Sequence, residues 1–247
     1  SIHAGAEKAS QDLGVEIIWQ GPQKEDDRAM QIQVVQNFVA RGVDAIVLAP
    51  LDDTALVRPV RDATRRGIKV VIIDSDLNSE DHISFVATDN FKGGQLAARR
   101  LGEIMGGKGK AIMMRYSEGS ASTHNREEGF LEVMAKEFPE IELLSTNQYG
   151  GVTSESAFQR GQNLLNQYGA QVDGIFCPNE SSAFGMLRAL QTSGKAGVVK
   201  FVGFDISPAL YKGFQDGQIN GLTVQNPFRM GYLGVQTAVQ ALEGQDV

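Results

Sequence analysis

The sequence predicts an α/β protein built from two similar domains, each a doubly wound parallel sheet, with a ligand cleft between them. Apolar runs without alternation recur along the 247 residues, and segments with helical spacing separate them, which is typical of parallel strands covered on both faces. The stretch VDAIVLAPLDDTAL from Val43 also resembles VDGIFCPNESSAF from Val172. Each is followed by a helix, a glycine and a strand that ends in aspartate, which favours a repeat over chance similarity.

In the first half, three strands alternate with three helices. The predicted strands are VEIIW (15–19), AIVLA (45–49) and KVVII (69–73). Helices are predicted from the apolar spacing of Ile2, Ala6, Ala9 and Leu13, then of Met30, Val34 and Phe38, and then of Leu56, Val60 and Ala63. Because the chain opens directly on a helix, either Ser1 is its N-cap or an earlier strand precedes it.

The second half repeats this alternation. Its predicted strands are KAIMM (110–114), IELLS (141–145), GIFC (174–177) and VVKFVGF (198–204). GEIMGGK (102–108) has the glycine spacing of a phosphate loop, but Gly109 replaces the required Ser or Thr. The segment also precedes a strand instead of following one, so a turn is expected.

Composition narrows the class of ligand. A net charge of -7 argues against nucleic acid and anionic membrane surfaces, which need excess Lys and Arg, and suits a neutral or cationic ligand. No run approaches the 18 or so apolar residues of a membrane span.

The single cysteine, Cys177, lies in the stretch GIFCPN, where a small buried residue is expected. His3, His82 and His124 have no paired metal spacing, so neither a metal nor a cofactor is expected.

Two acids occupy matching positions at predicted strand ends. Asp74 and Asp205 each follow a strand, at the edge where parallel sheets bind ligands. Taken singly, each could be a helix N-cap or part of an Asx-turn. For Asp205, the helix to be capped would be the one near Pro208. Together they favour a site between the domains. As a pair they could also serve a glycosidase as acid and base, although one would need a raised pKa.

Other polar residues follow apolar segments and suit the hydroxyl groups of a sugar. Asn179 and Glu180 follow GIFCP, and Gln225 and Asn226 follow GLTV. Arg126 lies in a loop-rich run and could instead pair with Glu127 or Glu128 at the surface. Tyr149 could cover an apolar sugar face or be an ordinary loop aromatic.

The chain resembles the type 1 periplasmic binding proteins, and most closely the ribose-binding branch that serves sugar ABC transporters. The likeness rests on VDAIVLAPLDDTAL, ATDNFKGGQLAA, REEGF, the stretch from CPNESSAFGMLRALQTSGK to VVKFVGFDISP, and GLTVQNPFRMGYLGV. It implies sugar contacts at Asp74, Arg126, Tyr149, Asn179, Asp205 and Gln225. The ribose-binding pattern has Arg after the first acid, where this chain has Ser75, which argues against ribose as the ligand.

The resemblance also implies domain organisation and partners. Residues 1–88 plus 226–247 would form the first domain and 89–225 the second, with hinge crossings near Thr88–Asn90 and Gln225–Pro227. Asp89 could simply cap the helix that starts near Phe91. The family begins with a strand and ends with a segment that are absent here, so a trimmed start that carried a signal peptide is expected.

The function implied is a monomeric solute-binding protein, not an enzyme, that delivers a monosaccharide to an ABC permease. It would work in the periplasm, or tethered by lipid outside a Gram-positive cell, and would meet the membrane only through the permease. The alternatives are the effector-binding core of a LacI-type regulator and a glycoside hydrolase.

Overall fold

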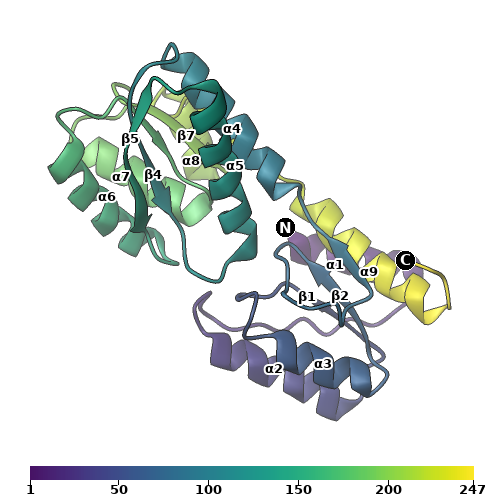
Figure 1. Cartoon of the computed structure of the whole chain (residues 1–247). Helices are drawn as coiled ribbons and strands as arrows, with labels where there is room; N and C mark the ends of the chain where they lie inside the picture. The colour runs from purple at the N-terminus through teal and green to yellow at the C-terminus, as the bar shows by residue number, and fades with distance from the viewer. The chain divides into compact units, whose positions relative to one another are not determined.

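The computed structural model describes residues 1–247 as two compact units (Figure 1). Unit 1 comprises Ser1–Thr88, Gly119–Ser122 and Asn226–Val247, and unit 2 comprises Asp89–Glu118 and Thr123–Gln225. None of the helices combines the length and the apolar composition needed to cross a membrane. The sequence-based division into two domains that move about a hinge stays a prediction.

Unit 1 is a three-stranded parallel sheet between helices. Its strands β1 (Ala45–Leu48), β2 (Lys69–Ile73) and β3 (Ser84–Val86) lie in the order β1-β2-β3. Val70 and Ile72 of β2 pack toward α2 (Arg28–Arg41) and α3 (Val57–Arg65). Val71 and Ile73 pack toward α9 (Pro227–Leu242), against which α1 (Ile2–Leu13) lies. Successive side chains of a strand point to opposite faces, so helices cover both faces of this sheet.

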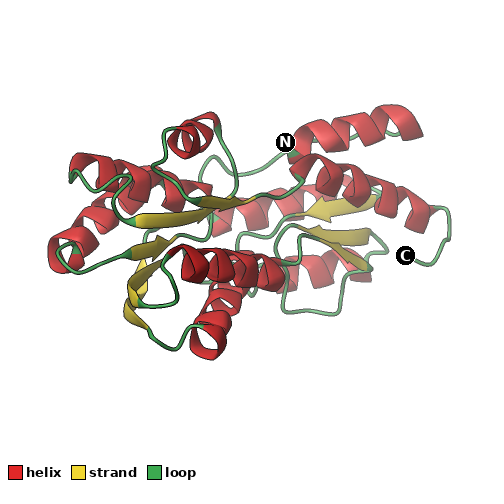
Figure 2. Cartoon of the chain, turned by 90° about the horizontal axis from the view of Figure 1, so that it is seen from above, coloured by secondary structure: helices red, strands yellow, loops and turns green.

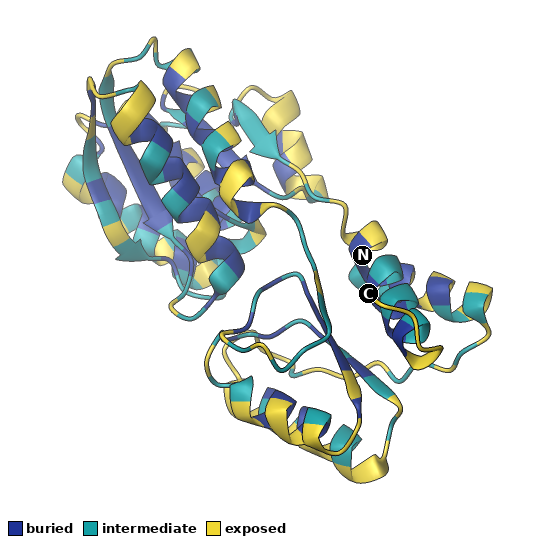
Figure 3. Ribbon diagram, turned by 45° about the vertical axis from the view of Figure 1, so that its right-hand side comes forward, coloured by how far each residue is buried: buried dark blue, intermediate teal, exposed yellow.

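Unit 2 is a larger version of the same arrangement, with parallel strands in the order β5-β4-β6-β7-β8. The strands are β4 (Gly109–Arg115), β5 (Ile141–Tyr149), β6 (Gly174–Phe176), β7 (Lys200–Phe204) and β8 (Gly221–Thr223). The helices are α4 (Asn90–Ile104), α5 (Ala121–Glu137), α6 (Ser154–Tyr168), α7 (Glu180–Thr192) and α8 (Pro208–Gln215). The two faces of this sheet belong to two separate cores, one beneath α4 and α5 and one beneath α6, α7 and α8. Figure 2 shows the strands lying among helices, and Figure 3 shows buried residues concentrated on the strands and on the inward sides of the helices.

The predicted repeat is present in the structure. β1, α3 and β2 in unit 1 correspond to β6, α7 and β7 in unit 2, and both strand pairs are parallel. The registers also correspond, because Ala45 lies opposite Lys69 and Gly174 lies opposite Lys200. The prediction of two similar doubly wound sheets is therefore confirmed.

Residues 15–19 do not form the predicted strand. A strand exists only where its backbone pairs with a neighbour, and VEIIW has no such partner. Val15 and Ile17 pack instead against the cluster of Ala6, Ala9 and Val235 between α1 and α9. Trp19, with 52% of its surface exposed, stacks on the ring of His3 at a centroid distance of 4.3 Å.

The helix predicted from Met30, Val34 and Phe38 is present as α2, but its buried face is shifted by one residue. Met30 is exposed, and the residues buried from α2 are Gln31 and Val35. Gln31 is buried because its amide binds the backbone after β1. Its Nε2 donates to the Ala49 carbonyl at 2.8 Å, and its Oε1 accepts from the Leu51 N–H at 2.9 Å.

Two predictions about single segments are confirmed. The glycine-rich stretch 102–108 lies at the end of α4 and in the turn before β4, where Gly106 and Gly107 have φ values of 70° and 77°. Cys177 is fully buried, and burial raises the pKa of its thiol well above the usual value.

Candidate functional site

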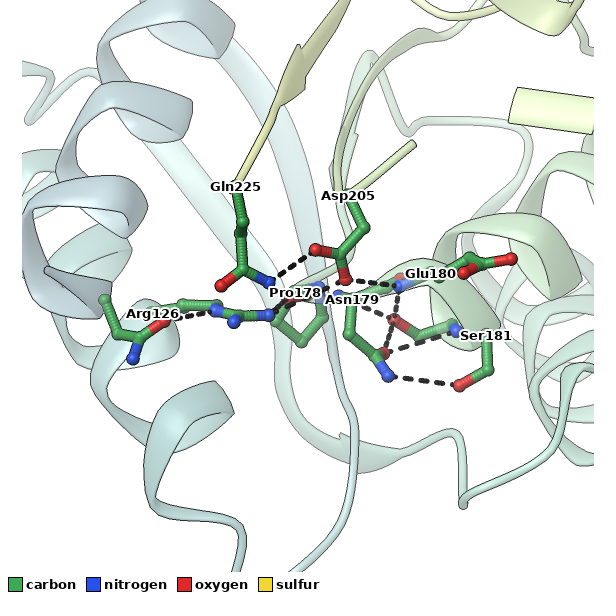
Figure 4. A network of polar contacts seen from close by, with 9 residues as sticks. Arg126, Pro178, Asn179, Glu180, Ser181, Asp205 and Gln225 are labelled. Atoms are coloured by element: carbon green, nitrogen blue, oxygen red, sulfur yellow. Dashed lines mark hydrogen bonds and ion pairs between the residues drawn. The ribbon is translucent and has the colours of Figure 1, made fainter. Parts of the chain in front are cut away.

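A polar network lies in unit 2 at the carboxyl ends of three adjacent strands. Asn179 follows β6, Asp205 directly follows β7, and Gln225 follows β8. Because β6, β7 and β8 are parallel neighbours, these residues share one edge of the sheet, which is where open α/β sheets bind ligands. Figure 4 shows them with Arg126, with Gln225 and Asp205 joined by a hydrogen bond and Asn179 beside Glu180 and Ser181.

Asp205 is held by contacts from two directions. Its Oδ1 accepts from Gln225 Nε2 at 2.6 Å, and its Oδ2 accepts from the backbone N–H of Glu180, the first residue of α7, at 3.1 Å. The alternative that Asp205 caps the helix near Pro208 is wrong. The N-cap of α8 is Ser207, whose Oγ accepts from the Leu210 N–H at 3.3 Å.

Arg126 is a buried cation at the centre of the network, with 3% of its surface exposed. Its Nε donates to Asn90 Oδ1 at 2.8 Å, its Nη1 donates to the Pro178 carbonyl at 2.9 Å, and its guanidinium carbon lies 3.9 Å from the centroid of the Phe204 ring. The Nη1 atom also lies 3.8 Å from Asp205 Oδ2. A guanidinium can be buried where acceptors, an aromatic face and a carboxylate replace its water.

The alternative that Arg126 pairs with Glu127 or Glu128 at the surface is also wrong, because both glutamates contact Arg115. Arg115 Nη1 donates to Glu127 Oε2 at 2.6 Å, and Arg115 Nη2 lies 3.7 Å from Glu128 Oε1. Glu127 is 2% exposed, and this burial raises the pKa of its carboxyl group, against the opposing effects of the Tyr116 N–H and Arg115.

Two consecutive glycines of α4 make room for Arg126 and its aromatic neighbour. A Cβ on Gly93 would lie 2.8 Å from the Phe204 ring, and a Cβ on Gly94 would lie 1.9 Å from the Arg126 carbonyl oxygen. Glycine inside a helix is unfavourable by about 1 kcal/mol relative to alanine. The lower helix propensity of glycine at position 94 is therefore offset by the close approach that it permits between α4 and α5 at Arg126.

Asn179 and Tyr149 have different positions relative to this network. Asn179 is the N-cap of α7 in a reciprocal capping box with Ser182, and its Nδ2 donates to Ser181 Oγ at 3.1 Å. Tyr149 is the last residue of the edge strand β5 and is partly exposed. Strands β4 and β6 lie between β5 and β7 in the sheet. The structure therefore brings Arg126, Asn179, Asp205 and Gln225 to one region of the sheet edge, whereas Tyr149 ends the edge strand on the opposite side of the sheet from β8.

In unit 1, Asp74 is the structural counterpart of Asp205. Asp74 and Asp205 are the only non-glycine residues with positive φ, at 65° and 69°. The Asp74 N–H donates to the carbonyl of Val86 at the end of β3, as the Asp205 N–H donates to the carbonyl of Thr223 at the end of β8. Non-glycine residues with such φ values are uncommon and concentrate at functional sites.

Ser75 follows Asp74 and is 5% exposed. Its Oγ accepts from the Ser122 N–H at 3.1 Å, and both residues belong to unit 1. A serine at this position therefore binds the backbone of residues 119–122 through its hydroxyl group.

Sequence reasoning missed Asn90, which is buried and accepts from Arg126. The signal was present in the stretch ATDNFKGGQLAA, but Asn90 there resembles an ordinary polar residue at a helix start. The preceding Asp89 does cap α4, because its Oδ1 accepts from the Lys92 N–H at 3.0 Å. Contact with a residue 36 positions further along the chain leaves no local pattern.

Comparison with known proteins places this geometry in a family. The family model described as a periplasmic binding protein domain matches residues 1–246, which is almost the whole chain. The chain belongs to the periplasmic binding protein domain family. A ribose import binding protein of Salmonella typhimurium is 30% identical over 247 residues, covering 100% of this chain and 81% of that protein.

Solved structures of periplasmic binding proteins agree with the fold. The periplasmic component of an ABC-type sugar transport system from Hahella chejuensis matches with a TM-score of 0.96 and 35% identity, covering 100% of this chain and 89% of that one. A carbohydrate transporter solute-binding protein from Agrobacterium radiobacter, in complex with D-arabinose, matches with a TM-score of 0.95 and 31% identity, covering 100% and 84%. The predicted periplasmic binding protein type 1 fold is confirmed, and these relatives are binding proteins, not enzymes.

Proposed function

We propose that this periplasmic binding protein captures a monosaccharide and delivers it unchanged to an ABC-type sugar permease. The observation that carries the proposal is the network at the ends of β6, β7 and β8, in which Arg126, Asp205 and Gln225 are held by contacts with one another and with the backbone. Sugar-binding relatives of the same fold support the choice of ligand.

The chemistry of this network suits a polyhydroxylated ring. A carboxylate offers about four acceptor sites, an amide offers donors and acceptors, and a guanidinium offers five donors in a plane. Neighbouring hydroxyl groups can meet such planar groups in pairs, and bonds to charged groups are the stronger ones. Since their positions are already fixed, these side chains lose little conformational freedom when the sugar binds.

The ligand-binding residues proposed for the whole chain come from both units. Unit 2 supplies Arg126, Tyr149, Asn179, Asp205 and Gln225, and unit 1 supplies Asp74 and Ser75. The positive φ shared by Asp74 and Asp205 supports a matched role for these two acids.

The import and transport roles printed for the relatives support a proposed partner and place of action. The protein works in the periplasm, or tethered by lipid outside a Gram-positive cell, and acts as a monomer that meets the membrane only through its permease. The net charge of -7 supports a role that does not involve nucleic acid.

A thermal-shift screen tests the proposal. The panel contains D-ribose, D-arabinose, D-xylose, D-glucose, D-galactose, D-allose and xylitol, each followed by recovery of the compound for mass spectrometry. A ligand present at about 100 times its dissociation constant stabilises the native state by about 2.7 kcal/mol. We expect at least one sugar to raise the melting temperature and to be recovered unchanged. No shift with any compound, or conversion of the one that binds, contradicts the proposal.

A further inference from the structure

We propose that Asn90 is a positioning residue that holds the Arg126 guanidinium apart from Asp205, so that both groups are presented to the ligand. The inference rests on the proposed function, because Arg126 and Asp205 are proposed sugar contacts. It adds a residue that would act on the sugar only through Arg126.

Asn90 is well placed for this role because its own position is fixed. It is the first residue of α4, and the preceding Asp89 caps that helix through the Lys92 N–H. Asn90 is 6% exposed, and its Oδ1 accepts from Arg126 Nε at 2.8 Å. Because a guanidinium has only donors, the amide must present its oxygen to Arg126. The contact therefore has one orientation.

The distance between Arg126 and Asp205 shows what this contact does. Arg126 Nη1 and Asp205 Oδ2 are 3.8 Å apart, whereas a charge-assisted N–H···O bond is about 2.7–2.9 Å long. Asn90 holds the guanidinium at Nε and the Pro178 carbonyl holds it at Nη1. Asp205 is held by Gln225 and the Glu180 N–H instead. The cation and the anion are thus kept near each other without forming a direct hydrogen bond.

This spacing matters for binding. If Arg126 turned onto Asp205, the two would satisfy each other as a bidentate pair, and a sugar would have to break that pair before it could bind. A neutral acceptor at position 90 prevents this turn without adding a second negative charge beside the guanidinium. An acid there would keep the acceptor but compete with Asp205 for the cation.

The test compares Asn90→Leu with a matched control on the same helix pair. Gln95 of α4 donates to Glu132 of α5 through Nε2 to Oε2, also at 2.8 Å. We expect Asn90→Leu to weaken binding of the tightest panel sugar by about tenfold or more, as loss of a hydrogen bond to a charged group allows. Gln95→Leu should leave the affinity unchanged. Asn90→Asp, which keeps the acceptor, should lose less affinity than Asn90→Leu.

A double-mutant cycle shows whether Asn90 acts through Arg126. Arg126→Lys keeps the charge but has no Nε–H for Asn90. In that background we expect Asn90→Leu to cost little further affinity, since coupled residues give non-additive effects. An equal loss in both backgrounds, or wild-type affinity in Asn90→Leu, overturns the proposal.

A readout without sugar separates this proposal from the proposed function. The measurement is the rate at which the Arg126 Nε proton exchanges with water, and its resonance is assigned by its disappearance in Arg126→Lys. Without ligand, this exchange should be slow in the wild type, in Asn90→Asp and in Gln95→Leu. It should be rapid in Asn90→Leu. If no panel sugar binds, the proposed function fails while this result still decides the role of Asn90. Should Asn90→Leu not fold, rapid exchange in the wild type or in Asn90→Asp overturns the proposal, and slow exchange in both supports it.

Discussion

At the scale of single residues, Asp74 and Asp205 show how backbone geometry and side-chain chemistry combine. Each adopts a left-handed φ that is unfavourable for most residues and that Asp and Asn tolerate better than others. Each is secured by a hydrogen bond from its own N–H to the end of the next strand in the sheet. The turn brings the carboxylate of Asp205 to the edge of the sheet, beside α7 and Gln225.

Replacing Asp205 by Asn tests its proposed role as a sugar acceptor. Asn keeps the size and tolerates the positive φ, but its NH2 group would face a donor, either Gln225 Nε2 or the Glu180 N–H. We expect affinity for the sugar to fall about tenfold to a hundredfold, which corresponds to roughly 1.5–3 kcal/mol, in a protein that stays folded. Calorimetric titration measures the loss. The control is Ser207→Ala, which removes the actual cap of α8 and should cost about 1 kcal/mol of stability without changing affinity. Wild-type affinity in Asp205→Asn would remove this acid from the site.

Glu127 gives a pH dependence of stability with a defined sign. Burial raises the pKa of its carboxyl group above the ordinary 4.5. Between 4.5 and the raised value, the folded protein binds more protons at this site than the unfolded chain does, so the contribution of Glu127 to the free energy of unfolding decreases as pH rises. Denaturant unfolding of wild type and Glu127→Gln at several pH values from 4 upward measures this. The stability of wild type minus that of the variant should fall with rising pH, and a difference that rises would contradict the prediction.

At the scale of elements, the contact between α4 and α5 sets the position of Arg126. Gly94→Ala would place a Cβ 1.9 Å from the Arg126 carbonyl oxygen, so the two helices would have to separate. We expect both stability and sugar affinity to fall. Gly5→Ala is the matched control, because its Cβ would also lie 1.9 Å from a backbone oxygen, that of Phe228 in unit 1. Melting curves should show a loss of stability in both variants, whereas titration should show the loss of affinity mainly in Gly94→Ala. Equal affinities would mean that this helix contact does not position Arg126.

The sequence predicted most elements because their signals are local. Buried parallel strands such as β2 and β7 appear in the sequence as continuous apolar runs. A capping residue such as Asp89 marks the start of a helix, here α4. VEIIW has the same composition, but strand formation depends on a neighbour that local sequence does not describe. The three-residue strand β3 was missed for the same reason, since its pairing with β2 defines it.

The site was predicted in part for similar reasons. The acids after β2 and β7 follow from strand ends and the repeat, and the strand order then brings Asn179 and Gln225 to the same edge as Asp205. The sequence left open whether Arg126 forms a surface ion pair and whether Asp205 caps the helix near Pro208. Both questions depend on contacts with residues distant in sequence. Asn90 lies 36 residues from Arg126, and Glu180 lies 25 residues from Asp205. Gln31 is buried for the same kind of reason, because its two hydrogen bonds join it to residues that lie 18 and 20 positions further along the chain.

At the scale of the whole molecule, sugar binding should change how unit 1 and unit 2 are arranged. The proposed contact residues come from both units. The sugar should therefore bind more tightly to the conformation in which the residues of both units reach it, and it should shift the population toward that conformation. Small-angle scattering with and without the tightest panel sugar should show a smaller radius of gyration at saturation. The Asp205→Asn variant at the same sugar concentration should show a smaller change. Identical scattering profiles with and without saturating sugar would argue against hinge closure.

The stacking of Trp19 on His3 has a practical consequence for studies of unfolding. Trp19 is the only tryptophan in the chain and belongs to unit 1, so it is an intrinsic optical label confined to one half of the protein. Tryptophan emission during denaturation therefore follows unit 1, whereas far-ultraviolet circular dichroism averages the helices of both units. Coincident curves would mean that the halves unfold as one cooperative body, and separated curves would resolve the stability of each half without any engineered probe.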